Sequence, residues 1–183
     1  MKPTTLVTLI FSLLVGAALA GDPAQPTLEQ MKKLYPAAAS FVKKPLDLSG
    51  HTREHIEEAL GFKLDGHDLK TPAYVVRGAD GRSLGAVWPT DVHLPEGKYA
   101  DVLVGVDTKG AVVGVLVWGG PVPAIQEGAY LEQYKGKNAD SPIRVGKDIK
   151  PAAGQKGPSA DLADSVRRAV LVLSHGLLKA HQH

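Results

Sequence analysis

ADVLVGVDTKGAVVGVLVW, residues 100–118, is the stretch that decides the fold of this chain. Two runs rich in β-branched residues, 100–106 and 111–118, flank the polar turn Asp107-Thr108-Lys109-Gly110. Apolar, β-branched runs joined by a short turn that ends in glycine are typical of an antiparallel hairpin. The sequence therefore predicts a β-hairpin over residues 100–118.

A second hairpin precedes the first. Residues 73–77 (AYVVR) and 84–88 (LGAVW) flank Gly78-Ala79-Asp80-Gly81, another strong turn signal. Because sequential strands usually pair with one another, the two hairpins predict one antiparallel sheet.

The last part of the chain predicts a long amphipathic helix that starts near Pro158 or Ser159. Arg167, Arg168 and Lys179 lie off its apolar stripe. The stripe has three- and four-residue spacings and consists of Leu162, Val166, Ala169, Val170, Leu173 and Leu177. An apolar helical stripe and a sheet bury their apolar faces against one another. We therefore expect an α+β fold, with an antiparallel sheet of two hairpins packed against the C-terminal helix.

Short helices are expected before the sheet. Thr27, with Gln30 three positions on, indicates a capping box for a helix that Pro36 ends. A second helix is expected from Thr52, as its cap, to Leu60. The predicted organisation is an N-terminal helical segment at 21–70, followed by a domain at 71–183.

The first twenty residues have the pattern of a signal peptide. Lys2 precedes a mostly apolar run at 6–19, and Ala18-Leu19-Ala20 is a small-x-small cleavage signal. We expect a periplasmic or otherwise exported protein with no stable membrane span after cleavage. An uncleaved N-terminal anchor is the alternative, and the intact mass of the exported protein distinguishes the two.

Composition excludes several classes of protein. The formal net charge is +2 and no basic stripe is present, which argues against nucleic acid as a partner. The chain has no cysteine, which excludes a lipoprotein box, disulfides and a C-x-x-C-H haem attachment. It has no G-x-S-x-G, Walker A, G-x-G-x-x-G or paired-carboxylate motif. There is thus no stand-alone catalytic motif, and enzymatic activity would require a bound cofactor.

The segment from Glu127 to Leu178 carries a family resemblance. It contains an aromatic-Gly-Lys element at 134–137 (YKGK), Asp148-Ile149 at the start of a loop, and a helix with ADSVRRA at 163–169. This order resembles the FMN-binding domain family, which comprises the periplasmic flavin subunits of Rnf and Nqr redox complexes. With the two hairpins included, the resemblance covers roughly residues 74–178.

The resemblance also implies a cofactor site, with two departures from the family pattern. The family esterifies FMN to a threonine just before the helix, but Lys156 occupies that position here, and an amine is no substrate for that esterification. The family's E-T-P-G turn corresponds to 119–123 (GGPVP), which has no glutamate. The resemblance therefore implies non-covalent FMN, with the helix N-terminus facing the phosphate. The residues that it assigns to the site are Gly119, Gly120, Pro121, Gly154, Lys156 and Ser159.

The function implied by the resemblance is that of a flavoprotein in periplasmic electron transfer. Its partner would be a redox protein such as a multihaem cytochrome, or a membrane quinone or Rnf-type complex. The alternative is a flavin-free scaffold, or a ligand- or partner-binding module, that keeps the fold without the cofactor site. Asp161 favours this alternative, because a carboxylate in the first helical turn competes with a phosphate for the same N–H groups.

Histidines and tryptophans give weaker signals. His51-Thr52-Arg53-Glu54-His55 matches the H-x-x-E-H zinc-protease pattern, but a cap at Thr52 would leave His51 outside the helix. No residue is assigned to a metal: His67, His93 and His175 have no ligand-spaced neighbours, and His181 and His183 belong to a frayed tail. Trp88 and Trp118 are expected at strand ends, as sheet-edge or core residues. Because both tryptophans end a strand, both indoles are also expected near the pocket. Stacking on a flavin there is the alternative to a packing role.

Overall fold

The computed structural model describes residues 25–178. The expected signal peptide at 1–20, His181 and His183 lie outside these residues. The helices and strands, in chain order, are α1 (Leu28–Leu34), β1 (Ser40–Lys44), α2 (Gly50–Leu60), β2 (Ala73–Arg77), β3 (Ser83–Leu94), β4 (Lys98–Val106), β5 (Val112–Trp118), α3 (Gly128–Leu131) and α4 (Lys156–Leu173). Three 3₁₀ turns, η1 (Pro95–Gly97), η2 (Pro123–Ile125) and η3 (Glu132–Tyr134), and a closing π turn, η4 (Ser174–Leu178), complete them.

The sheet has five strands in the order β1-β2-β3-β4-β5, and every neighbouring pair is antiparallel. Both predicted hairpins, β2–β3 and β4–β5, are confirmed. One strand was not predicted: β1, with the sequence SFVKK, pairs with β2 at the edge of the sheet. The N-terminal segment 21–70 is therefore not only helical, since it supplies one strand of the sheet.

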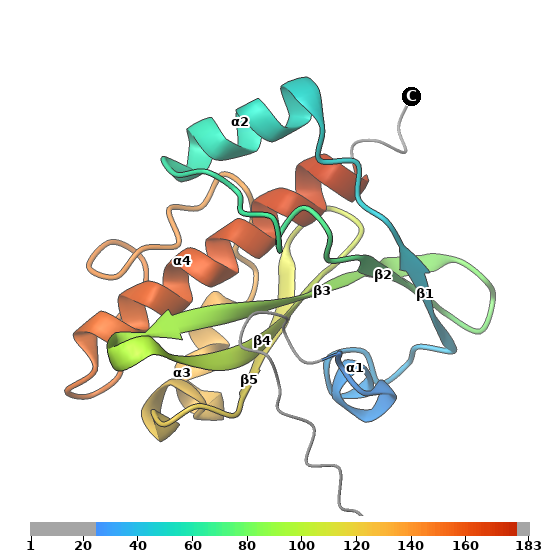
Figure 1. Ribbon diagram of the computed structural model, residues 1–183. Coiled ribbons are helices and arrows are strands. Elements are labelled where there is room, and N and C mark those ends of the chain that lie inside the picture. Colours follow the sequence, from blue (N-terminus) through green and yellow to red (C-terminus); the bar gives the residue numbers. More distant parts are fainter. Residues whose placement is uncertain (1–24, 179–183) are drawn as a thin grey trace, which may run out of the picture.

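Helix α4 crosses one face of the sheet (Figure 1), as its apolar stripe predicts. Leu162, Val166 and Leu173 are completely buried against strands β3 and β4. The helix begins at Lys156, two to three residues before the predicted start near Pro158 or Ser159. Helix α2 lies over α4 on the side away from the sheet, and Arg167 of α4 donates to the carbonyls of Ala59 and Leu60 at the end of α2. The α+β fold is confirmed.

Helix α1 packs on the opposite face of the sheet. Its predicted capping box is present: Thr27 Oγ1 accepts from the Gln30 N–H, and Gln30 Oε1 accepts from the Thr27 N–H. Met31 and Tyr35 are buried there, and the Tyr35 hydroxyl donates to the Val106 carbonyl of β4. This contact attaches the N-terminal segment to the end of β4.

The two tryptophans lie on opposite faces, contrary to the expectation that both are near one pocket. Trp88 lies within β3, because this strand continues to Leu94, and its side chain is completely buried under α4 with Nε1 donating to the Thr71 carbonyl. Trp118, at the end of β5, packs in the cluster formed with α1. Trp88 is therefore a core residue, and the two indoles cannot both line one cofactor pocket.

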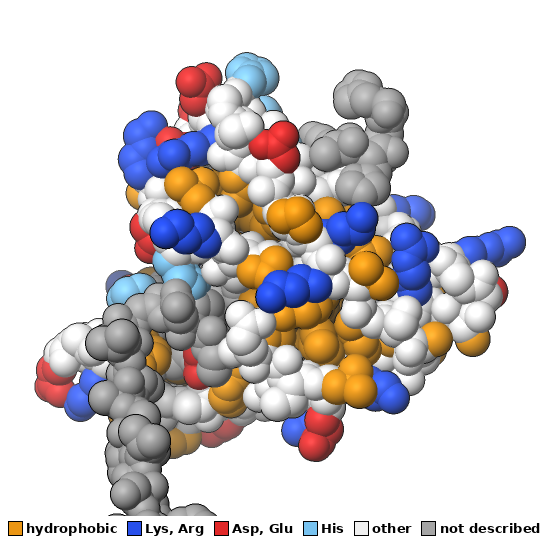
Figure 2. Space-filling model, turned by 45° about the vertical axis from the view of Figure 1, so that its right-hand side comes forward, with side chains coloured by type: hydrophobic (Ala, Val, Ile, Leu, Met, Phe, Trp, Pro, Cys, Tyr) orange, Lys and Arg blue, Asp and Glu red, His pale blue; other side chains and the backbone are white. Residues whose placement is uncertain are grey.

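The edge of the sheet at β1 carries exposed basic side chains. Figure 2 shows this side of the molecule, where Lys and Arg are dispersed around hydrophobic side chains. Lys43 and Lys44 are exposed on the edge strand itself, and charged side chains on an edge strand oppose pairing with a second sheet. Within residues 25–178, none of the helices combines the length and the apolar character that a membrane span requires.

Candidate functional site

The start of α4 is the helix terminus to which the resemblance assigns the FMN phosphate. Gln155 is the N-cap, and no side chain forms a capping hydrogen bond there. Lys156, the first helical residue, and Gly157 are exposed. A helix N-terminus without a side-chain cap presents backbone N–H groups and the positive end of the helix dipole to an anion. The exposed Lys156 ammonium adds a positive charge at the same place.

Ser159, one turn further along α4, has a different environment from Lys156. It is completely buried, and its Oγ accepts a hydrogen bond of 3.0 Å from the backbone N–H of Ala152. This bond holds the loop before α4 against the helix. The Ser159 hydroxyl faces the protein interior, so a direct phosphate contact would require the bond to Ala152 to break.

The turn after β5 contains three of the other residues assigned to the site. Gly119, Gly120 and Pro121 are all exposed. Gln126 Nε2 donates to the Gly119 carbonyl at 2.6 Å and so holds the turn in place. Gly120 has a φ of 72°, and a Cβ there would lie 2.6 Å from the Cβ of Ala100. The close approach to β4 accounts for this glycine without a cofactor.

The structure brings the two parts of the assigned site to one end of the molecule. The segment after β5 and the start of α4 lie at the same end of the sheet (Figure 1), and η2 contacts α4. Gly154, just before the helix, is exposed with a φ of 68°. Three hollows on the described surface are lined by other residues. The assigned residues other than Ser159 are thus exposed at this end of the molecule.

Acidic groups also lie near the start of α4. Burial raises the pKa of Asp161, and the nearby carboxylate of Asp164 raises it further, whereas His93 opposes the increase. An anion at this terminus would meet the Asp161 charge as well as the N–H groups. The electrostatic environment is therefore mixed.

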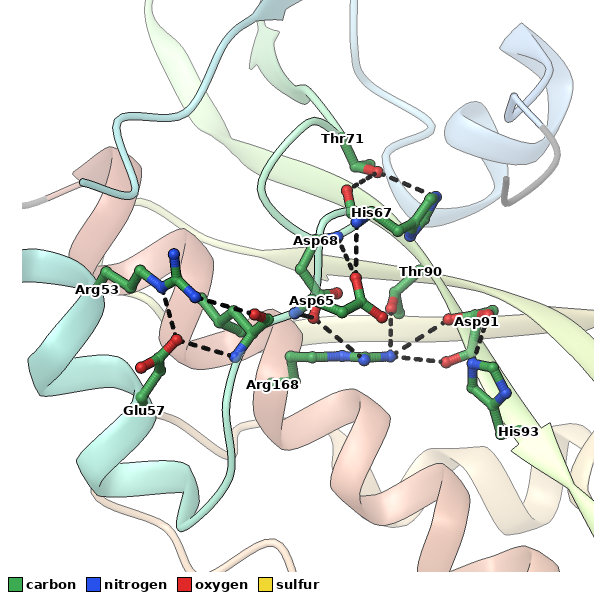
Figure 3. Close-up of polar contacts among 11 residues, drawn as sticks. Arg53, Glu57, Asp65, His67, Asp68, Thr71, Thr90, Asp91, His93 and Arg168 are labelled. Carbon is green, nitrogen blue, oxygen red and sulfur yellow. Dashed lines mark hydrogen bonds and ion pairs between the residues drawn. The ribbon is translucent and has the colours of Figure 1, made fainter. Parts of the chain in front are cut away.

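A buried charge network lies further along α4, and the sequence analysis did not predict it. Arg168 is 8% exposed, and its guanidinium lies between Asp68 and Asp91 (Figure 3). Nη1 is 3.4 Å from Asp68 Oδ2, while Nη2 donates to Thr90 Oγ1 at 2.8 Å and to the Asp91 carbonyl at 3.0 Å. The network joins α4, β3 and the loop before β2.

The histidines fall into two places that matter for metal binding. Helix α2 begins at Gly50, so His51 and His55 lie one turn apart within it, and the predicted cap at Thr52 is wrong. Both are exposed. Among the described residues, one group has three His, Asp or Glu side chains close enough to share a metal ion. It consists of Asp65, His67 and Asp68. Sequence spacing does not indicate this group, because it contains one histidine and depends on how the 65–68 loop folds.

A hollow of about 380 Å³ lies at the other end of α4, between α2, the β4–β5 turn and η4. Two histidine rings, His55 and His175, pack at its wall with their centroids 4.7 Å apart. Ser174 also lines it, and the buried Oγ of Ser174 has no hydrogen-bond partner among the described residues. This hollow is separate from the assigned flavin site.

No model of a known protein family matches the chain, and a search of curated proteins finds no similar sequence. The family resemblance therefore depends on the motif residues given above.

Proposed function

We propose that this protein is an FMN-binding module of an exported electron-transfer system and that it holds the flavin non-covalently. One observation carries the proposal: α4 starts without a side-chain cap and with the exposed Lys156 as its first residue, at the point where the family pattern places the FMN phosphate. The glycine-rich turn at 119–121 lies at the same end of the sheet. The phosphate would bind to the backbone N–H groups and to Lys156, with the flavin ring over the open surface beside the turn.

The non-covalent mode of binding follows from the side chains at this terminus. A phosphoester needs a hydroxyl, and the residue at the acceptor position is Lys156. The nearest hydroxyl along the helix, that of Ser159, is buried and bonded to Ala152. In this proposal Ser159 fixes the loop, and Lys156 is a point-charge partner of the phosphate.

Export and the redox partner are the parts of the proposal that rest on sequence pattern and resemblance. The signal-like segment supports a location in the periplasm or outside the cell. The family's setting then implies that a multihaem cytochrome or a membrane quinone or Rnf-type complex exchanges electrons with the bound flavin.

Visible absorption of the purified protein tests the proposal. After incubation with FMN and removal of free ligand, the protein should keep the absorption of oxidised flavin and lose all of it to the filtrate when it is denatured. Flavin that stays with the denatured chain would overturn the non-covalent mode. A protein that keeps no flavin after any loading would overturn the proposal itself.

The second candidate function is a flavin-free module that binds another ligand or a partner protein. The specific observation in its favour is the environment of the flavin surface: Asp161 and Asp164 lie nearby, and the hollow of about 380 Å³ between α2 and η4 lies at the other end of α4. The hollow beside His55, His175 and Ser174 would then be the binding site. Loss of ligand binding on substitution of His175, but not of Lys156, would distinguish this function from the first.

A further inference from the structure

The outer edge of β5 is unpaired along most of its length. This strand ends the sheet on the side opposite β1. At Val112, the N–H donates to the Lys137 carbonyl at 2.7 Å and the carbonyl accepts from the Gly136 N–H at 2.8 Å. From Val113 to Trp118, no backbone group forms a backbone hydrogen bond outside β4 among the residues that the structure describes. The chain thus pairs with the first residue of this edge and leaves the rest open.

A hollow of about 430 Å³ lies along this open edge. Four consecutive residues of β5, 113–116, line it. Because successive side chains of a strand point to opposite faces, a hollow lined by consecutive residues meets the strand at its backbone edge. Leu34 of α1 and Leu131 of α3 also line it, and Figure 1 shows these two helices to either side of β5. The hollow is therefore a groove with a strand edge as its floor and helices as its walls.

The sequence of β5 lacks the features that protect a strand edge. VVGVLVW, residues 112–118, has neither a charged residue nor a proline, and Val115 and Val117 are only 7% and 6% exposed. The opposite edge strand, β1, carries Lys43 and Lys44. Unpaired N–H and C=O groups on an apolar edge are a template for a further strand, and native proteins oppose such pairing with charges or proline. Of the two edges of the sheet, β5 is the one suited to strand addition.

The charges of the groove balance one another. Lys33 Nζ lies 3.8 Å from a carboxylate oxygen of Glu29, and Lys135 Nζ lies 2.7 Å from one of Glu132. Each lysine that lines the groove therefore has its own carboxylate, and the complementary occupant is uncharged. A helix could not pair with the floor, because its backbone groups are bonded internally. An extended segment has backbone groups free to pair with β5.

We propose that the groove beside β5 binds an extended, uncharged and apolar segment of a partner protein, which joins the sheet next to β5. Backbone hydrogen bonds to the open edge would supply the affinity, and alternate side chains packed on Leu34 and Leu131 would supply the selectivity. A strand rises about 3.3 Å per residue, so the edge from Val113 to Trp118 accommodates a segment of about six residues.

Fluorescence anisotropy with a labelled, end-capped peptide of alternating valine and threonine tests the groove. The peptide should bind the wild-type protein saturably, and Val113→Lys should weaken it by at least about 10-fold, because a lysine on the edge opposes pairing. Val42→Lys, on the other edge strand, is the matched control and should keep the affinity. Equal affinity of wild type and Val113→Lys, or no saturable binding to wild type, would overturn the proposal. So would undiminished binding of the same peptide with every backbone nitrogen methylated, since that probe cannot donate hydrogen bonds.

Amide hydrogen exchange of the wild-type protein, followed by NMR, gives a second test that needs no substitution. The peptide should slow the exchange of amides between Val113 and Trp118 and leave those of β1 unchanged. Protection confined to β1 or to the start of α4 would overturn the groove as the binding site. A peptide-free protein that dimerises with protected β5 amides would also overturn the proposal, because a second copy would then be the occupant.

Discussion

Ser159 Oγ accepts a hydrogen bond from the Ala152 N–H at 3.0 Å inside the protein core. This relationship separates the role of Ser159 from that of its neighbour Lys156. Replacing Ser159 by alanine leaves a buried N–H without a partner, so the free energy of unfolding should fall by about 1–3 kcal/mol. FMN affinity should not change, because the hydroxyl does not face the phosphate. Urea unfolding and FMN titration of Ser159→Ala check both points, and lost affinity with unchanged stability would place the hydroxyl on the ligand.

The Arg168 network should be the most sensitive polar feature of the fold. Arg168→Met removes the charge that Asp68 and Asp91 share, and breaking a buried ion pair on one side typically costs about 3–5 kcal/mol of the free energy of unfolding. Arg82→Met is the matched control. The Arg82 side chain is 86% exposed, and its loss should change stability by less than about 0.5 kcal/mol. Equal stabilities of the two variants in chemical denaturation would contradict this account of Arg168.

Glu57 gives the fold a dependence on pH. Hydrogen bonds from Lys63 and then Arg53 lower its pKa from 4.5 to about 2. A lowered pKa in the folded state means that the stabilisation by Glu57 is complete above pH 4.5 and is lost as the pH falls towards 2. The urea concentration at the midpoint of unfolding should therefore be higher for wild type than for Glu57→Gln, and the difference should be largest at neutral pH. It should become smaller as the pH falls through the acid range. A difference that is independent of pH would show that the charge of Glu57 does not contribute.

Gly85 in β3 should tolerate no side chain. Its φ is 142°, and a Cβ would lie 2.0 Å from the Val106 carbonyl oxygen and 2.7 Å from the Tyr35 hydroxyl. In Gly85→Ala, backbone strain should lower the free energy of unfolding by about 1–3 kcal/mol. Overpacking against Val106 and Tyr35 should lower it by a further amount of similar size. Gly136→Ala, which also has a positive φ but nothing within 4 Å of its Cβ, should show the strain alone. Thermal unfolding of the two variants measures the difference, and equal losses would contradict the close contact between Tyr35 and β3.

Some of this structure could be predicted from the sequence, for physical reasons. The hairpins and α4 have strong sequence patterns. β-branched runs around a glycine-containing turn pair as a hairpin, and an apolar helical stripe is buried against a sheet. Strand β1 lacks such a pattern: it is short, lies at the sheet edge and is mostly exposed, so its sequence contains lysines. Its pairing with β2 depends on the tertiary fold.

The candidate sites were less predictable, because they depend on side-chain directions. Sequence spacing placed Lys156 and Ser159 at the start of α4 but could not show that one points to solvent and the other to Ala152. Arg168 was expected only to lie off the apolar stripe, and its burial depends on Asp68, which is 100 residues away in the chain. The grouping of Asp65, His67 and Asp68 likewise depends on the turn that Asp65 stabilises.

A comparison of FMN with riboflavin tests the central claim most directly, since the two ligands differ only in the phosphate. If the start of α4 binds the phosphate, fluorescence titration at low salt should show FMN binding about 10- to 150-fold more tightly than riboflavin, as expected for a charge-assisted contact. Lys156→Ala should remove most of this difference, high salt should reduce it, and Lys109→Ala, at the opposite end of β5, should leave it intact. Equal affinity for the two flavins, or no saturable binding of FMN, would contradict the account.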